Sequence, residues 1–399
     1  MNLLNDNNNV ENLYVDSNVP KLAGEIYYND LYAETGGKWI VGSLENDSSI
    51  LVTYNKISVF RQVLSKIDGR RNIEELQNEI NTLNIKCDVK EIIIYLSANG
   101  IVEYDNIKKK DFSEIRNLSI NLFSIRLTWL VRFLKRNMTI LDRFYEVLFF
   151  FMVSLFVFNT LNNNFGNLFL YENSVLKGYL ISNVSMVISL LLHEFSHCYQ
   201  ALKKGLNPEK LSFVLYFGWF PMFYIKIPNM YSLERNDLLQ VISAGAKSNI
   251  FQALFWMNLY FISRNELFKM FALGNISIFI YNLMPISLTD GYFYMSIMLR
   301  KSNLRLNLYK FVMYVFNKSK KIKLDIDNFD RIYYVLAISF ILIGPLFNQV
   351  HLIYAIFSLL GIQIFCEKYI LLIIPILIIF NGILNYIVIT YKTKNYINA

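Results

Sequence analysis

The pentapeptide His193-Glu194-Phe195-Ser196-His197 lies inside an apolar stretch, residues 176–199, that is long enough to form a membrane helix. Residues four apart share one face of a helix, so both imidazoles can reach a single metal ion while Glu194 lies beside a bound water. Two histidines and a glutamate are costly at membrane depth, which argues against a purely structural role. The pentapeptide therefore predicts a catalytic zinc site with Glu194 as the general base.

The composition of the whole chain predicts a membrane protein. Of its 399 residues, 54% are hydrophobic and 16% are aromatic, and several apolar runs approach the length needed to span hydrocarbon. The net charge of +8 could indicate nucleic-acid binding, but much of the Lys and Arg lies beside the apolar runs, as the positive-inside rule requires of cytoplasmic loops. We therefore expect membrane lipid as a partner and no nucleic acid.

Cysteine usage and the amino terminus add two expectations. Cys87, Cys198 and Cys366 are far apart and show no paired spacing, so neither a disulfide framework nor a cysteine metal site is expected. Residues 1–9 are rich in Asn and contain no apolar core. No cleavable signal peptide is therefore expected, and the amino terminus is predicted to stay in the cytoplasm.

Residues 1–105 are predicted to form a small cytoplasmic α+β domain. Alternating residues predict short strands, and apolar residues at helical spacing predict three helices. Strands followed by three helices and a wing are the winged-helix pattern. The strands are expected at 25–28, 39–42, 49–54 and 101–104, and the helices at 57–67, 73–80 and 89–96.

The segment 60–104 resembles the PqqD-like domains that bind the leader peptides of ribosomally made, modified peptides. The resemblance rests on residues 68–76 (DGRRNIEEL) and 96–102 (LSANGIV). It implies that this domain binds the leader of a precursor peptide. A generic cytoplasmic domain without a ligand is the alternative, because winged helices serve many purposes.

A basic, aromatic-rich linker is predicted at 106–143, lying as an amphipathic segment on the inner leaflet. A first span is predicted at 144–161, and the loop 162–174, which is poor in basic residues, should lie outside. The second span, 176–199, returns to the cytoplasm and carries the pentapeptide at its inner end. The active site is therefore expected near the cytoplasmic face.

Aromatic and β-branched residues at 211–216 and 223–227 predict a hairpin that dips into the membrane interface. An open sheet edge is not tolerated in lipid, so the hairpin must be covered by protein or paired with another strand. An extended substrate could pair with it, and a covering flap without substrate contact is the alternative. The candidate substrate contacts on this hairpin are Phe213, Tyr216 and Tyr224.

The next two predicted spans complete the metal site. The third, 243–262, opens with small residues that allow close helix packing. The fourth, 267–283, is followed by Pro285 and Asp290-Gly291, which are expected to end the helix and to present a carboxylate from irregular backbone inside a polar cavity. Asp290 is therefore the best third metal ligand.

Together these features resemble the site-2 protease family of membrane-embedded zinc metalloproteases. The resemblance implies that His193, His197 and Asp290 hold Zn²⁺. It also implies that Glu194 activates water and that Asn282 helps to position the substrate or its oxyanion. The family usually has Pro after the Ala-Gly pair, whereas this chain has Ala246, which affects the local helix shape and not the chemistry. The motifs are His193-Glu194-x-x-His197, Ala244-Gly245 with Asn249, and Asn282-x-x-Pro285 with Asp290-Gly291, all within 176–300.

The rest of the chain completes the expected architecture. Residues 301–331 are rich in Lys and Arg, which predicts a cytoplasmic loop, and 332–399 contain further apolar runs. We expect a polytopic α-helical membrane protein with about 6–7 membrane segments. Its site-2-protease-like core should occupy 144–300, with the cytoplasmic α+β winged-helix domain before it.

The expected function is that of a zinc metalloendopeptidase of a bacterial inner membrane, cleaving a peptide near the cytoplasmic face. A leader-binding module joined to a protease points to maturation of a ribosomally synthesised, modified peptide before or during export, with a peptide exporter as a further partner. Regulated intramembrane cleavage of a signalling protein is one alternative. Another is an export or immunity component that binds peptide without cleaving it, although such a binder has no use for a base at Glu194.

Overall fold

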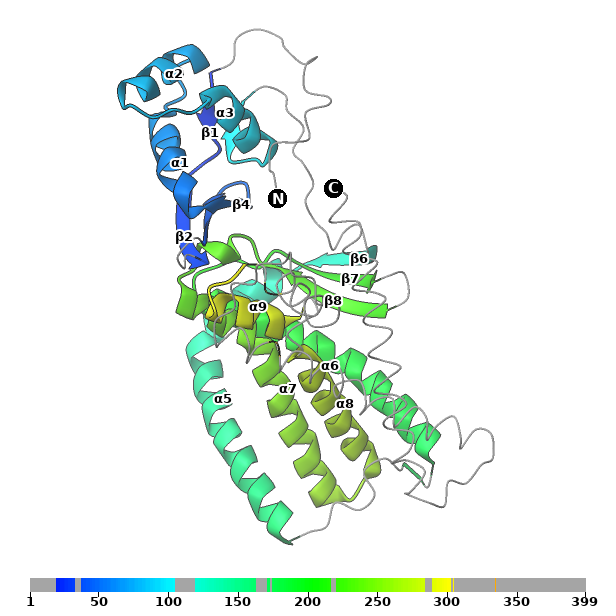
Figure 1. Cartoon of the computed structure of the whole chain (residues 1–399). Helices are drawn as coiled ribbons and strands as arrows, with labels where there is room; N and C mark the ends of the chain where they lie inside the picture. Colours follow the sequence, from blue (N-terminus) through cyan, green and yellow to red (C-terminus); the bar gives the residue numbers. More distant parts are fainter. Residues whose placement is uncertain are drawn as a thin grey trace. The chain divides into compact units, whose positions relative to one another are not determined.

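The computed structural model describes residues 19–32, 37–104, 119–162, 171–172, 174–216, 220–283, 289–302, 304 and 334. The chain divides into two compact units, residues 1–112 and residues 113–399. The described part is largely helical and contains three small β-sheets (Figure 1).

The amino-terminal unit contains a three-stranded antiparallel sheet and three helices. Its sheet has the order β2-β3-β4, and β5 returns to pair antiparallel with β1. The predicted strands and helices are confirmed, but β1 was not predicted because a two-residue strand has no alternation to detect. The elements are β1 (Lys21–Leu22), β2 (Ile26–Tyr32), β3 (Lys38–Ser43), β4 (Ser48–Thr53), α1 (Tyr54–Lys66), α2 (Ile73–Thr82), α3 (Val89–Ala98) and β5 (Val102–Glu103).

The hydrophobic core of this unit lies between the β2-β3-β4 sheet and the three helices. Alternation along the strands and helical spacing along α1, α2 and α3 bring aliphatic side chains onto facing surfaces. Each fully buried side chain of this kind contributes about 1.5–3 kcal/mol, so the unit has a core of its own. Its buried members include Val41, Val52, Phe60, Val63, Leu64, Leu76, Ile80, Ile93 and Leu96.

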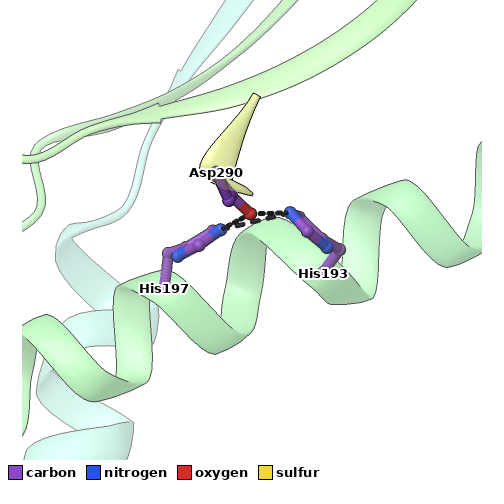
Figure 2. A group of neighbouring side chains, drawn as sticks. All are labelled: His193, His197 and Asp290. Atoms are coloured by element: carbon purple, nitrogen blue, oxygen red, sulfur yellow. Dashed lines mark hydrogen bonds and ion pairs between the residues drawn. The ribbon is translucent and has the colours of Figure 1, made fainter. Parts of the chain in front are cut away.

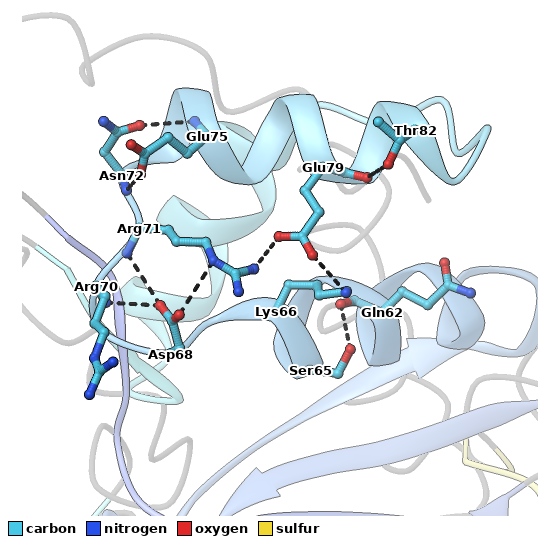
Figure 3. Close-up of polar contacts among 10 residues, drawn as sticks. All are labelled: Gln62, Ser65, Lys66, Asp68, Arg70, Arg71, Asn72, Glu75, Glu79 and Thr82. Atoms are coloured by element: carbon cyan, nitrogen blue, oxygen red, sulfur yellow. Dashed lines mark hydrogen bonds and ion pairs between the residues drawn. The ribbon is translucent and has the colours of Figure 1, made fainter.

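A charged network fixes the turn between α1 and α2 (Figure 3). Asp68 accepts hydrogen bonds from the backbone N–H groups of Arg70 (2.9 Å) and Arg71 (3.2 Å). Glu79 on α2 pairs with the Arg71 guanidinium and with Lys66 Nζ at 2.7 Å. The Arg70 N–H holds the pKa of Asp68 below its ordinary value, and the Lys66 hydrogen bond lowers the pKa of Glu79.

Side-chain caps set where α2 and α3 begin. Asn72 and Glu75 form a reciprocal capping box at the start of α2, each accepting a hydrogen bond from the other's backbone N–H. Asp88 accepts the backbone N–H of Glu91 at the start of α3. These caps satisfy donors that the first helical turn leaves unpaired.

The second unit is a helical bundle with a three-stranded sheet. Helices α6, α7 and α8 pack on one another, and α5 packs on α7. The β6-β7-β8 sheet and α9 lie at the same end of this bundle (Figure 1). The elements are β6 (Ser119–Arg126), α5 (Thr128–Asn162), α6 (Val175–Lys203), β7 (Lys210–Tyr216), β8 (Phe220–Lys226), η1 (Met230–Ser232), α7 (Arg235–Ser263), α8 (Glu266–Asn282) and α9 (Asp290–Met298).

The structure corrects the prediction for residues 106–143. Residues 119–126 form β6, which pairs with β7, and α5 runs without a break from Thr128 instead of starting at 144. A register shift between Asn121 and Phe123 interrupts the period-two pattern that would have identified β6 as a strand. The predicted β7–β8 hairpin is confirmed, and β7 is its central strand.

Two helices in the described part of the chain are long and apolar enough to cross a membrane, Thr128–Leu161 and Leu176–Lys203. The predicted third and fourth spans fall on α7 and α8, which do not meet this measure. The predicted loop 301–331 and the apolar runs of 332–399 lie outside the described residues, apart from 301, 302, 304 and 334. The expected 6–7 segments therefore stay a prediction.

Candidate metal centre

The site begins on one face of α6. His193 and His197, one helical turn apart, are only 3% and 8% exposed, and their rings contact α7 and α9. Buried Ser185 and Ser189 continue the same face toward the amino-terminal end of the helix. The i, i+4 spacing thus brings both imidazoles to one side of α6, as the pentapeptide predicts.

Asp290 on α9 faces the two histidines of α6, and its carboxylate points toward both imidazoles (Figure 2). The Asp290 Oδ2 atom lies 3.0 Å from His193 Nε2 and 3.2 Å from His197 Nε2, and the two Nε2 atoms are 3.1 Å apart. Ligand atoms around a tetrahedral zinc ion are about 3.3 Å apart when the metal bonds are about 2.0–2.1 Å. The three donor atoms therefore fit a zinc ion after small outward movements.

The far nitrogen of each imidazole also has a partner. His197 Nδ1 lies 2.7 Å from the Val241 carbonyl oxygen on α7, so it carries the proton and leaves Nε2 free to bind metal. His193 Nδ1 lies 3.1 Å from the Asn249 amide nitrogen. The buried Asn249 Oδ1 has no hydrogen-bond partner in the described structure, and rotating the amide by half a turn would let it accept the His193 Nδ1–H.

Gly245 allows α7 to approach these rings. A Cβ atom at this position would lie 2.2 Å from His193 Cε1 and 2.5 Å from His197 Nε2, which is closer than any real contact. The small residues predicted at the start of the third span therefore have a specific purpose. Only glycine leaves room for both imidazoles against α7.

Asp290 is the first residue of α9, and this corrects the prediction that it projects from irregular backbone. The following Gly291 packs against the end of α8, where a Cβ atom would lie 2.5 Å from the Asn282 carbonyl oxygen. At the other end of α9, the Arg235 guanidinium donates to the carbonyls of Ile297 (3.3 Å) and Met298 (2.6 Å). Both ends of the short helix that carries the carboxylate are thus fixed.

Glu194 lies beside the three ligand side chains and interacts electrostatically with all of them. Its Oε2 atom accepts the backbone N–H of Ile225 on β8 at 2.9 Å. Among the described strands β8 lies at one edge of its sheet, so this hydrogen bond places the outer side of β8 next to the glutamate. One carboxylate oxygen is thus held in place while the other stays available for chemistry.

The remaining predicted residues lie at two places. Asn282 ends α8 next to Gly291, and its buried Nδ2 has no hydrogen-bond partner in the described structure. Phe213 on β7 packs against Phe223 with ring centroids 4.8 Å apart, which makes it part of the sheet packing. Tyr224 lies on β8, and the Tyr216 side chain lies outside the described part.

Three contributors to the site were not predicted from the sequence. Ile225 and Val241 act through backbone groups, which any residue type provides, so their identities carry no signal. Arg235 stands at the start of α7 and contacts α9 only after the chain has folded. Such contributions become visible only when the elements are placed in space.

Two histidines on one helix, a carboxylate from a second helix and a glutamate beside them form the arrangement of a zinc-dependent hydrolase site. The chain is 28% identical over 193 residues to a protein of Bacillus subtilis (strain 168) named "Putative peptide zinc metalloprotease protein YydH". This match covers 47% of the chain and 74% of the Bacillus protein. No family model and no solved structure matches the chain. The name of the Bacillus protein agrees with the metal chemistry that the geometry of His193, His197 and Asp290 indicates.

Proposed function

We propose that this protein is a membrane-embedded zinc endopeptidase of the site-2 protease type, with His193, His197 and Asp290 as zinc ligands. One observation carries the proposal. The three donor atoms, two from α6 and one from α9, lie 3.0–3.2 Å from one another, beside a glutamate that binds none of them. The similarity to a protein named as a peptide zinc metalloprotease supports the same reaction class.

Bound zinc would polarise the scissile carbonyl and make an attacking water more acidic. Glu194 takes a proton from that water as the water oxygen bonds to the carbonyl carbon. Glu194 then gives this proton to the leaving amide nitrogen as the C–N bond breaks. The Ile225 N–H holds Oε2, so the free oxygen faces the water in one orientation. The unpaired Asn282 Nδ2 donor is suited to binding a substrate carbonyl.

An extended peptide can reach this site along the outer edge of β8. In the part of the chain that the structure describes, the strand pairs with β7 alone, and the Ile225 N–H of its outer edge already faces Glu194. Main-chain hydrogen bonds to an edge strand hold a peptide extended, which exposes its carbonyls to attack. We therefore place the substrate as an added strand, with Tyr224 as a side-chain contact.

The membrane setting and the substrate belong to the same proposal. Two helices that are long and apolar enough to cross a membrane support a location in a bacterial inner membrane. The metal centre would lie near the cytoplasmic face and the amino terminus in the cytoplasm. The amino-terminal unit would bind the leader of a ribosomally made precursor peptide, as PqqD-like domains do. Cleavage would then mature the peptide before or during export, together with a peptide exporter.

The reaction is tested with Glu194→Gln in the purified full-length protein. This change removes the base but no metal ligand, so cleavage of a precursor peptide encoded beside the gene should fall about 10²–10⁴-fold with zinc unchanged. Glu146→Gln removes an exposed carboxylate on α5 and serves as the matched control. Wild-type turnover in the Glu194 variant would reject the assignment.

The leader-binding part needs its own experiment. Removing residues 1–105 leaves the metal centre intact, so the Michaelis constant for the precursor should rise far more than turnover falls. The comparison substrate is a single-span membrane protein, whose cleavage should not depend on this unit. Equal cleavage of the precursor before and after truncation would favour regulated cleavage of a signalling protein.

A further inference from the structure

Four arginines at the end of β6 and in the first half of α5 have no acidic partner in the described part of the chain. We call Arg126, Arg132, Arg136 and Arg143 the arginine group, and all four are exposed. Three lysines on neighbouring elements do have acidic partners. Ion pairs join Lys203 to Asp142 at 2.9 Å, Lys204 to Asp237 at 2.6 Å and Lys226 to Glu209 at 3.2 Å.

The spacing of these arginines makes an external anion favourable. Arg132 and Arg136 are four residues apart on α5, where like charges repel and destabilise a helix. A phosphate between two such guanidiniums removes the repulsion and accepts bidentate hydrogen bonds from both. The arginine group thus has the charge and chemistry of a phosphate-binding surface.

Exposed apolar side chains lie between the arginines. Trp129 is 68% exposed, Phe133 is 54% exposed and Ile140 is 70% exposed, and they share a stripe of α5. Further along the same helix the exposed surface becomes aromatic and aliphatic, including Phe150 and Phe158. Tryptophan beside arginine, followed by an apolar surface, is typical of a helix that passes from lipid headgroups into hydrocarbon.

This segment lies at the same level of the bundle as the metal centre. Leu134 and Met138 of α5 pack in the cluster that contains Phe195 and Cys198 of α6. The Tyr199 hydroxyl also donates to the Met138 carbonyl at 3.0 Å. The α6 residues that surround His197 are therefore beside the turns of α5 that carry the arginines.

We propose that the arginine group binds the phosphates of anionic phospholipids and thereby holds the metal centre at the polar interface of the membrane. This inference rests on the proposed membrane location, and it goes beyond the proposed reaction by naming a lipid class and its binding residues. A bilayer is the occupant because the apolar stripe continues from the arginines into the exposed surface of α5. A soluble phosphate would leave that stripe in water.

The test measures retained lipid in the full-length protein. Wild type, Arg126→Gln/Arg132→Gln/Arg136→Gln and the charge-matched control Lys56→Gln/Arg70→Gln/Lys86→Gln are placed in nanodiscs of phosphatidylglycerol and phosphatidylcholine. After transfer to detergent, mass spectrometry gives the ratio of the two bound lipids. Wild type and control should retain phosphatidylglycerol preferentially, and each arginine removed should lower that preference about fivefold, equivalent to about 1 kcal/mol.

Further arms separate this inference from the proposed reaction. The Glu194→Gln protein should retain the same lipid as wild type, because retention does not depend on cleavage. Arg→Lys at the same three positions keeps the charge but loses the bidentate hydrogen bonds, so it should restore part of the preference and show that the loss in the Gln variant follows the charge. Equal ratios in wild type and the Gln variant, an equal loss in the control, or displacement of the lipid by inorganic phosphate would each overturn the inference.

Discussion

The charged network between α1 and α2 and the metal centre both bring carboxylates and nitrogen bases together, but they do so in opposite ways. At the turn, Asp68 and Glu79 meet Lys66 and Arg71 at the surface, so two carboxylates are matched by two cations. At the metal centre, three donor atoms converge on one point with a single carboxylate among them. The first arrangement is complete as it stands, whereas the second leaves lone pairs directed at a common centre, as a metal site requires.

The largest loss of bound zinc and of cleavage is expected from filling the space that Gly245 leaves for the imidazoles. Gly245→Ala places a methyl group 2.2 Å from His193 Cε1, so α7 must move away or the ring must turn. Overpacking of this kind costs about 1–3 kcal/mol, and here it also misplaces two ligands. Bound zinc and cleavage should both be lost. The measurement is zinc per chain, with Ser243→Ala in the same turn as the control, and full zinc in the Gly245 variant would contradict the packing argument.

A smaller effect is expected at Asn249, which orients a ligand and does not bind the metal. Asn249→Ala removes the partner of His193 Nδ1, so zinc affinity should fall about 10–100-fold. A zinc-buffered titration measures the change, and Asn249→Asp, which restores an acceptor, should recover most of it. Unchanged affinity in the Ala variant would show that the ring is held by packing alone.

The smallest effect belongs to the surface network. Because the pKa of Glu79 is lowered in the folded state, its contribution to stability is present above the ordinary carboxylate pKa and is lost as the pH falls through the lowered value. Glu79→Gln should therefore melt slightly below wild type near pH 7, and the difference should shrink toward acid. Thermal melts of the amino-terminal unit across this range, at low and high salt, measure it. A difference that grows toward acid would have the wrong sign.

The sequence predicted the grouping of His193, His197 and Asp290 better than it predicted the sheet beside them. His193, His197 and Asp290 could be identified because helical spacing and a chemically unusual residue at membrane depth are both local signals. β6 was missed because its alternation is interrupted at residues 121–123 and its partner β7 lies some 90 residues along the chain. Pairing across that distance is decided by tertiary contacts, which no local pattern records.

The two units differ in how clearly the sequence marks the beginnings of their helices. The predicted helices of the amino-terminal unit are confirmed because caps such as Asn72 and Asp88 mark their beginnings. In the second unit, α5 and α7 both begin earlier than predicted, at Thr128 and Arg235. Charged residues near their beginnings, such as Arg132 and Lys135 in α5 and Arg235 and Asp237 in α7, conceal the start of a long helix from a search for apolar runs. The backbone groups of Ile225 and Val241 complete the site without any sequence signal.

The binding of zinc by His193, His197 and Asp290 is tested most directly by zinc K-edge absorption spectroscopy on the purified full-length protein, together with the zinc content per chain. We expect one zinc ion per chain with nitrogen and oxygen ligands and no sulfur ligand, although Cys198 is next to His197 in the sequence. Asp290→Ala should lose most of this zinc, and His193→Ala should lose it as well. A full zinc complement with an unchanged spectrum in the Asp290 variant would contradict the three-ligand site.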